Sequence, residues 1–127
     1  MGEQFSDLDI VALRPFVPAK DFETSLRFYG DLGFTTYRLS DSLASIHLGP
    51  FAFLLQTFNA EGFAANFMMH LLVNDLESWW RRIEGLDLAA RYGVKAPSAP
   101  ALQPWGLTVA YVFDPSGVLW HIAQNPD

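Results

Sequence analysis

The chain contains one pattern twice, and this internal repeat limits the folds that it can adopt. Asp21 opens the stretch DFETSLRFYGDLGF, and Asp75, 54 residues later, opens DLESWWRRIEGLDL. Each Asp suits the N-cap of a helix, because its carboxylate can accept from the free amides of the first turn. Apolar residues then recur at helical spacing in both copies, at Phe22, Leu26 and Tyr29 and at Leu76, Trp80 and Ile83. Two amphipathic helices are therefore predicted, and Gly33 is placed to end the first.

Strand-like segments surround each predicted helix in the same order. One precedes each helix, at residues 10–17 and 66–73. Three follow it, at 34–40, 43–49 and 51–58 in the first copy and at 88–93, 107–113 and 118–124 in the second. A lone copy would leave one sheet face uncovered, so the copies should assemble around a shared interior. We predict an α+β fold in which two tandem β-α-β-β-β modules form a curved, partly open sheet around a cleft.

We expect one domain over residues 1–127, with module one at about 8–60 and module two at about 66–125. The stretch 93–106 carries three prolines, which remove backbone donors and fix φ, so it should not form a regular strand. It ends in Trp105 and Gly106. An indole there could serve as a lid or platform for a ligand, or simply pack over the mouth of the sheet.

Composition excludes several classes of function. The formal net charge of −6 disfavours nucleic acid and anionic membranes as partners, since both are polyanions. The absence of cysteine excludes disulfides and thiolate catalysis. The first residues lack a signal-peptide pattern and no apolar run approaches the roughly 20 residues of a membrane helix, so we expect a cytoplasmic protein. The sequence shows no Ser-His-Asp arrangement and no paired carboxylates at strand spacing. It therefore does not indicate an enzyme that works without a metal.

Two stretches, DFETSLRFYGDLGF and VFDPSGVLWHI, resemble the helix-one and C-terminal signatures of the vicinal oxygen chelate superfamily, which includes glyoxalases, dioxygenases and bleomycin-resistance proteins. RPFVPAKDF, from Arg14, and LQPWGLTVAYVFDPSGVLWHIAQN, from Leu102, are most similar to the bleomycin-resistance proteins. This resemblance covers nearly the whole chain. It implies a homodimer without enzymatic activity, which sequesters a cationic glycopeptide drug in clefts at the subunit interface.

The enzymes of this superfamily hold a divalent metal on four inward-facing strand positions. The resemblance places these positions at Arg14, Leu54, Met68 and His121. Arg stays protonated and repels a cation, Leu has no donor atom, and Met is too soft for the metals of oxygen-rich sites. A recruited set of His70, His121 and Gln56 would supply only two good ligands, whereas closed sites use three or four. We therefore expect no metal and no other cofactor.

The same alignment predicts a mostly apolar cleft with a few polar groups, which is typical of a small-molecule pocket. Its predicted ligand-binding residues are Arg14, Phe16, Leu54, Gln56, Met68, His70, Trp105 and His121. Phe34, Phe58 and Phe63 could add aromatic wall or belong to the core or an interface. The two histidines could instead be partly buried groups that have hydrogen-bond partners in the protein. A guanidinium at Arg14 would need an acidic partner, from the protein or from a ligand.

Few acidic residues fall on the predicted strands, and Asp41, Glu61 and Asp114 are expected at turns. This weakens the case for a cationic drug and leaves an anionic or neutral ligand open. Our leading hypothesis is a metal-free small-molecule-binding protein of the bleomycin-resistance type, which sequesters a planar or glycopeptide drug-like ligand. The alternative is a metal-dependent glyoxalase- or dioxygenase-like lyase with an atypical ligand set. A third hypothesis is a binding domain for an unrelated ligand.

Overall fold

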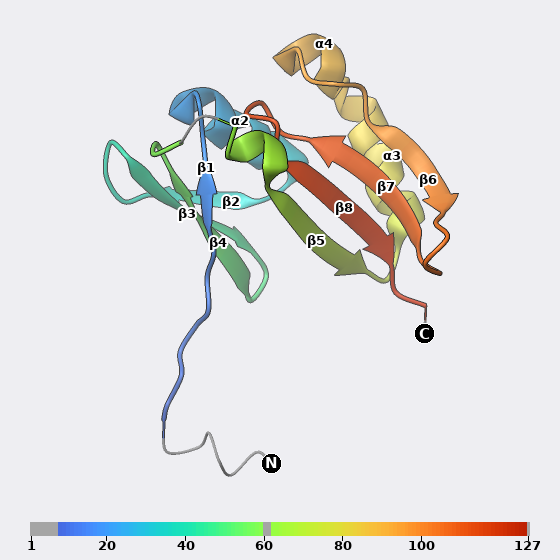
Figure 1. The fold of residues 1–127 in the computed structure, drawn as a ribbon, viewed down its shortest axis with the longest axis horizontal. Helices are drawn as coiled ribbons and strands as arrows, with labels where there is room; N and C mark the ends of the chain where they lie inside the picture. The colour runs from blue at the N-terminus through green and yellow to red at the C-terminus, as the bar shows by residue number, and fades with distance from the viewer. Residues whose placement is uncertain (1–7, 60–61, 127) are drawn as a thin grey trace.

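The two predicted modules fold as two four-stranded mixed sheets that do not close into a barrel (Figure 1). The computed structural model describes residues 8–59 and 62–126, so the ends of the predicted domain and the predicted turn residue Glu61 lie outside the described residues. Sheet A has the strand order β1-β4-β3-β2 and sheet B the order β5-β8-β7-β6. In both sheets the first strand of the module pairs in parallel with the last, and the other pairs are antiparallel. This agrees with the predicted tandem α+β fold.

Sheet A is built from module one, whose elements are β1 (Phe16–Pro18), α2 (Phe22–Leu32), β2 (Thr35–Arg38), β3 (Leu43–Leu48) and β4 (Phe51–Gln56). A short 3-10 helix, η1 (Ala64–Asn66), leads into module two. Sheet B is built from that module, whose elements are β5 (Met68–Val73), α3 (Leu76–Leu86), α4 (Leu88–Tyr92), β6 (Ser98–Leu102), β7 (Thr108–Phe113) and β8 (Leu119–Gln124). Among the described residues, no helix is both long and apolar enough to cross a membrane.

The repeated Asp residues cap the two long helices, as the sequence predicts. Asp21 accepts a hydrogen bond from the backbone amide of Thr24 at 3.1 Å, and Asp75 accepts one from that of Ser78 at 3.1 Å. Gly33 ends α2 with φ of +114°, a conformation that L side chains rarely adopt. The starts of α2 and α3 and the end of α2 are thus set by the residues that the sequence predicts.

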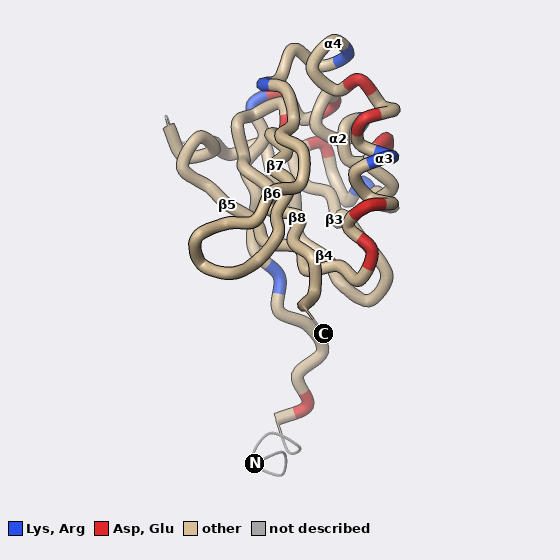
Figure 2. The backbone as a smooth tube through the Cα atoms, turned by 90° about the vertical axis from the view of Figure 1, so that its right-hand side faces the viewer, with Lys and Arg blue, Asp and Glu red and all other residues tan. Residues whose placement is uncertain are grey.

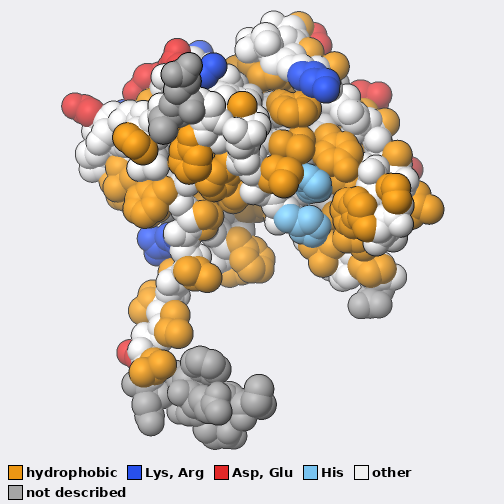
Figure 3. All heavy atoms as spheres, in the orientation of Figure 1, with side chains coloured by type: hydrophobic (Ala, Val, Ile, Leu, Met, Phe, Trp, Pro, Cys, Tyr) orange, Lys and Arg blue, Asp and Glu red, His pale blue; other side chains and the backbone are white. Residues whose placement is uncertain are grey.

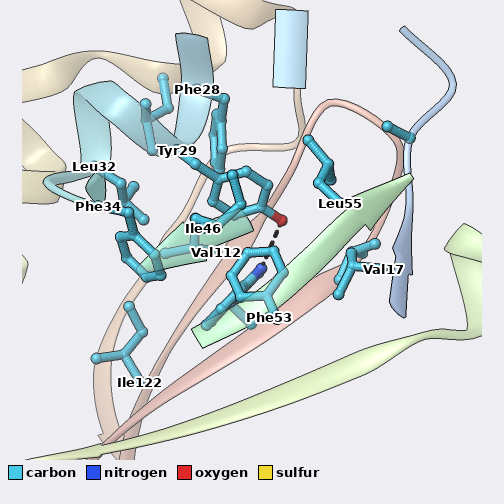
Figure 4. Packing of buried hydrophobic residues seen from close by; sticks show 14 of the residues in the cluster. Val17, Phe28, Tyr29, Leu32, Phe34, Ile46, Phe53, Leu55, Val112 and Ile122 are labelled. Carbon is cyan, nitrogen blue, oxygen red and sulfur yellow. Dashed lines mark hydrogen bonds between the residues drawn. The ribbon is translucent and has the colours of Figure 1, made fainter. Parts of the chain in front are cut away.

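The core lies between the helices and the two sheets and is rich in aromatic rings (Figure 4). Tyr29 of α2 is completely buried at its centre. Its hydroxyl donates to Asp114 Oδ2 at 2.6 Å and accepts from Trp120 Nε1 at 3.0 Å. The rings of Phe34 and Phe53 pack against Trp120 at 5.5 Å between centroids. One polar network inside an apolar cluster therefore ties module one to the last strand of module two.

Three sequence predictions about secondary structure are wrong in part. Residues 88–93 are not a strand, because Leu88–Tyr92 forms α4, whose alanines favour helix and whose Leu88 is buried. The proline-rich stretch does contain a strand, β6, since Pro100 is tolerated on an edge strand with a bulge between Ser98 and Ala101. The first strand, Phe16–Pro18, overlaps the predicted 10–17 only at Phe16 and Val17. The preceding residues 8–15, here called the N-terminal arm, extend away from the body (Figure 1).

Candidate functional site

The predicted ligand-binding residues lie in two groups, one on each sheet. Arg14, Phe16, Leu54 and Gln56 belong to the arm, β1 and β4 of module one, whereas Met68, His70, Trp105 and His121 belong to module two. Within the described residues, no hydrogen bond, ion pair or ring contact joins the two groups. A single chain therefore does not bring all eight residues into one cluster.

The group on sheet B centres on two histidines. His70 of β5 and His121 of β8 are direct partners in the parallel pair, so both side chains project from the same face, with ring centroids 6.1 Å apart. Tyr111 of β7 pairs with His121 from the other side, and its ring meets the imidazole edge-on at 4.9 Å. The strand register thus places two imidazoles and a phenol in one row across sheet B.

Trp105 lies beside the His121 end of this row, although it belongs to the hairpin between β6 and β7. A turn closed by the Gly106 amide donating to the carbonyl of Gln103 carries the indole, and Gly106 takes φ of +104°. The indole centroid is 6.2 Å from the imidazole of His121, and 53% of the residue stays exposed. An exposed indole beside the imidazole of His121 is well placed to stack on a planar group.

A hollow of about 330 Å³ opens beside His121 on the same face. Its lining combines donor groups with aromatic and aliphatic wall and consists of Lys95, Ser98, Tyr111, Phe113, Leu119 and His121. Only His121 was predicted from the sequence to belong to a site. Tyr111 and Phe113 alternate along β7 as a period-two pattern predicts, but only the pairing of β7 with β8 shows that they share a face with His121.

Neither imidazole has a hydrogen-bond partner among the described residues. Burial lowers the pKa of His121, and the neighbouring His70 lowers that pKa further. At neutral pH the His121 imidazole is therefore uncharged and offers one donor and one acceptor to the cleft. No hydrogen bond within the described residues accounts for either imidazole.

The group on sheet A is more open. Phe16 is opposite Leu54 in the parallel pair of β1 and β4 and is 51% exposed. Arg14 lies in the arm beside a second hollow of about 340 Å³, which also includes His47. His47 shares the face of Leu54 but is held by Ser45, whose Oγ lies 2.6 Å from its Nε2. Arg14 makes no ion pair with any described residue, so the acidic partner expected for its guanidinium is not supplied by this part of the chain.

A third hollow, of about 280 Å³, lies at the seam between the sheets. Its lining is apolar apart from His70 at its rim, so it can bury an apolar group but offers little to orient one. Phe34 borders this hollow and belongs to the core, at 6% exposed. Phe58 and Phe63 remain exposed and line none of the three hollows described here.

The donor set does not suit the divalent metal of the related enzymes. Over residues 8–59 and 62–126, no three His, Asp or Glu side chains are grouped so that they could hold an ion. The two adjacent imidazoles have a tyrosine as the next oxygen donor in their row, whereas closed sites usually have three or four His, carboxylate or thiolate ligands. We therefore derive no chemical step that passes through a metal.

The family assignment follows from comparison with known proteins. Residues 9–122 match the model of the Glyoxalase/Bleomycin resistance protein/Dioxygenase superfamily. The chain belongs to this superfamily. Within it, the chain is 30% identical over 115 residues to a bleomycin resistance protein of Klebsiella pneumoniae, covering 87% of this chain and 90% of that protein.

Solved structures of the superfamily agree with this assignment. A bleomycin-binding protein complexed with bleomycin has a TM-score of 0.78 and 27% identity, covering 90% of this chain and 98% of that one. A bleomycin resistance determinant encoded on the transposon Tn5 has a TM-score of 0.75 and 25% identity, covering 91% and 98%. A lactoylglutathione lyase from Agrobacterium tumefaciens, at 18% identity and a TM-score of 0.68, covers 91% of this chain and 95% of its own and shares the fold alone.

Proposed function

We propose that this chain is a metal-free small-molecule-binding protein of the bleomycin-resistance type, which holds a planar or glycopeptide drug-like ligand by stacking and burial. The observation that carries the proposal is the row of His70, His121 and Tyr111, with the indole of Trp105 against His121. It combines aromatic surface with unpaired donors and acceptors next to a hollow of about 330 Å³. This is the composition of a binding pocket. No three His, Asp or Glu side chains among the described residues are grouped so that they could hold a metal ion.

A homodimer explains why the predicted site falls into two groups. The N-terminal arm is apolar and strongly exposed, with Val11 at 91% and Leu13 at 95%. A segment of this kind is stabilised by covering it, and a second copy of the chain would do so. In such a dimer, sheet A of one copy, with Arg14 and Phe16, would face sheet B of the other and complete the cleft. The eight predicted residues would then line one site from two chains.

The dimer is tested by light scattering on the full chain, which has a mass of 14.2 kDa. We expect a particle of twice this mass, and we expect Val11→Asp combined with Leu13→Asp to give the monomer. A matched control is Leu39→Asp, since Leu39 is also exposed, at 58%, but lies outside the arm. A wild-type monomer at micromolar concentration would contradict the proposed dimer.

Ligand binding is tested by tryptophan fluorescence. Bleomycin and the uncharged planar compound 2-naphthamide are titrated separately, and we expect at least one to give a saturable change. Trp105→Phe should remove that change, whereas Trp79→Phe on α3 should leave it, because Trp79 packs against the core on the helical side. Flat titrations with both compounds, and with the acidic analogue 2-naphthoate, would overturn the proposed function.

Elemental analysis of protein purified without chelators separates binding from metal catalysis. We expect no stoichiometric divalent metal, and we expect dialysis against EDTA to leave ligand affinity unchanged. Stoichiometric nickel or iron that is lost in a His121→Gln variant would contradict the metal-free proposal and favour the lyase.

A further inference from the structure

The acidic side chains of this protein are separated from its concave sheet face. The described carboxylates belong to the helices and their caps, to turns or to the arm, as follows: Asp9, Asp21, Glu23, Asp31, Asp41, Asp75, Glu77, Glu84, Asp87 and Asp114. Figure 2 shows most of them on the side of α2 and α3, with Asp9 apart from the rest in the arm. On the face that carries the histidines, Figure 3 shows mainly hydrophobic side chains, and acidic side chains occur only at the margins of this view. Asp114 lies at a turn but is buried and bonded to Tyr29.

The hollow on sheet B is rich in donors instead. Lys95 lies at its edge, with Nζ 5.3 Å from the centroid of the Phe113 ring, and it has no ion pair among the described residues. Ser98 and Tyr111 add hydroxyl groups, and His121 adds an imidazole. A protein with a net charge of −6 therefore presents a cation, and no described carboxylate, at this hollow.

Such a pocket disfavours a cationic ligand and favours an anionic one. A cation entering it would lose water and meet Lys95 without a compensating carboxylate. An anion would pair with the ammonium group and accept hydrogen bonds from the hydroxyls and the imidazole. In the proposed dimer the charged residue on the opposite wall is Arg14, which has no acidic partner among the described residues either.

We infer that the preferred ligand of this cleft is a planar aromatic molecule that carries an acidic group, with the ring on Trp105 and Tyr111 and the acidic group at Lys95 and His121. This inference rests on the proposed function and names its ligand class. This ligand preference differs from that of a protein that binds a cationic glycopeptide.

Binding of an acidic ligand beside His121 should depend on pH. The groups that face His121 are His70 on β5, Tyr111 on β7, Ser98 on β6 and Lys95 before it, and none of them is a carboxylate. A bound carboxylate would therefore be the first negative charge beside the imidazole and would favour its protonated form. Binding of the anion should take up a proton and strengthen as the pH falls.

Three probes of the same size and ring system test the inference: 2-naphthoate, 2-naphthamide and 2-naphthylmethylammonium. Each is titrated into the full chain by calorimetry, with bleomycin as a fourth. We expect 2-naphthoate to bind most tightly, and its affinity to rise several-fold from about pH 8 to about pH 6, where histidine titrates. We expect the affinity of 2-naphthamide to stay within about twofold over the same range.

Variants identify the groups responsible. Lys95→Ala should lower the affinity for 2-naphthoate about fivefold, as expected for the loss of one exposed charge pair, and leave the affinity for 2-naphthamide unchanged. Lys20→Ala is the matched control, since Lys20 is the chain's other lysine and borders none of these hollows. His121→Gln should flatten the pH dependence. Retained 2-naphthamide binding shows that each variant is folded.

The outcomes separate the two proposals. Binding of 2-naphthylmethylammonium or bleomycin as tight as that of 2-naphthoate would overturn the inference and leave the proposed function standing. An equal loss of affinity for 2-naphthamide and for 2-naphthoate in Lys95→Ala would also overturn the inference and leave the proposed function standing. No saturable binding of any probe would overturn the proposed function and the inference together.

Discussion

Removing one buried oxygen atom, in Tyr29→Phe, tests whether the two modules are held together by the polar network in the core. The ring stays, so packing with Phe34, Phe53 and Trp120 is kept. What is lost is the hydrogen bond to Asp114 at 2.6 Å and the acceptor for Trp120 Nε1 at 3.0 Å. Both former partners stay buried, so water cannot replace the hydroxyl.

The magnitude follows from those two bonds. A hydrogen bond to a charged group contributes about 1.5–3 kcal/mol and one between neutral groups about 1 kcal/mol, so we expect Tyr29→Phe to lower the free energy of unfolding by about 3 kcal/mol. In a domain of this size such a loss lowers Tm by about 10 °C. The matched control Tyr37→Phe removes a hydroxyl from a residue that is 54% exposed, and we expect a change within about 0.5 kcal/mol.

The dependence on pH adds a second signature. Burial raises the pKa of Asp114, and the hydrogen bond from Tyr29 opposes that rise. Without the hydroxyl the pKa of Asp114 in the folded state rises further, so the variant takes up a proton at a higher pH than the wild type. The cost of the substitution should therefore be largest where Asp114 is ionised and should shrink as the pH falls.

Urea unfolding of both variants over a range of pH measures these effects. A cost of Tyr29→Phe no larger than that of Tyr37→Phe would refute the role of the network. A large cost that does not change with pH would refute the part assigned to the ionised carboxylate.

Three further predictions concern single residues. Because burial, and then His70, lower the pKa of His121, its imidazole should titrate below the usual 6.5 in NMR spectra. The contribution of His121 to stability is then present above that value and lost as the pH falls, so His121→Gln should reduce the slope of stability with pH between about 7 and 5. Gly33→Ala should lower the free energy of unfolding by about 1–2 kcal/mol, because Gly33 has φ of +114°; a change below about 0.5 kcal/mol in urea unfolding would contradict this. Asp75→Ala should lower the urea midpoint by removing the cap of α3, whereas Glu77→Ala in the same first turn should have a smaller effect, since Glu77 makes only a 3.7 Å ion pair with Arg81.

Much of the fold could be predicted because the repeat carries local signals with a direct physical cause. Asp21 and Asp75 mark the starts of the two long helices, and Gly33 marks the end of one. The predictions failed where tertiary position outweighs local pattern. Pro100 disrupts a central strand but not an edge strand, and the sequence does not reveal which strand lies at the edge. An apolar residue such as Leu88 fits a buried strand and a buried helix equally well, so the sequence pattern did not show that it begins α4.

The candidate site was predicted in its residue types but not in its arrangement. The alternation of side chains along β8 indicates that His121 and Leu119 share a face. Which strand lies beside His121 depends on pairing between distant segments, so Tyr111 and Lys95 could not be assigned to its surroundings. The distance between the two groups of predicted residues could not be predicted either, since the resemblance gives positions on strands and not how far apart the two sheets lie.

The central claim is that a ligand binds on the face of sheet B that carries His121 and Trp105. NMR spectra of the full chain with and without 2-naphthamide or bleomycin test it most directly, through the imidazole signals of His121 and the indole signals of the four tryptophans. We expect the signals of His121 and Trp105 to shift with a saturable dependence on ligand concentration, while those of Trp79 on α3 stay unchanged. Saturable shifts at Trp79 with His121 and Trp105 unmoved would place the ligand elsewhere and contradict it.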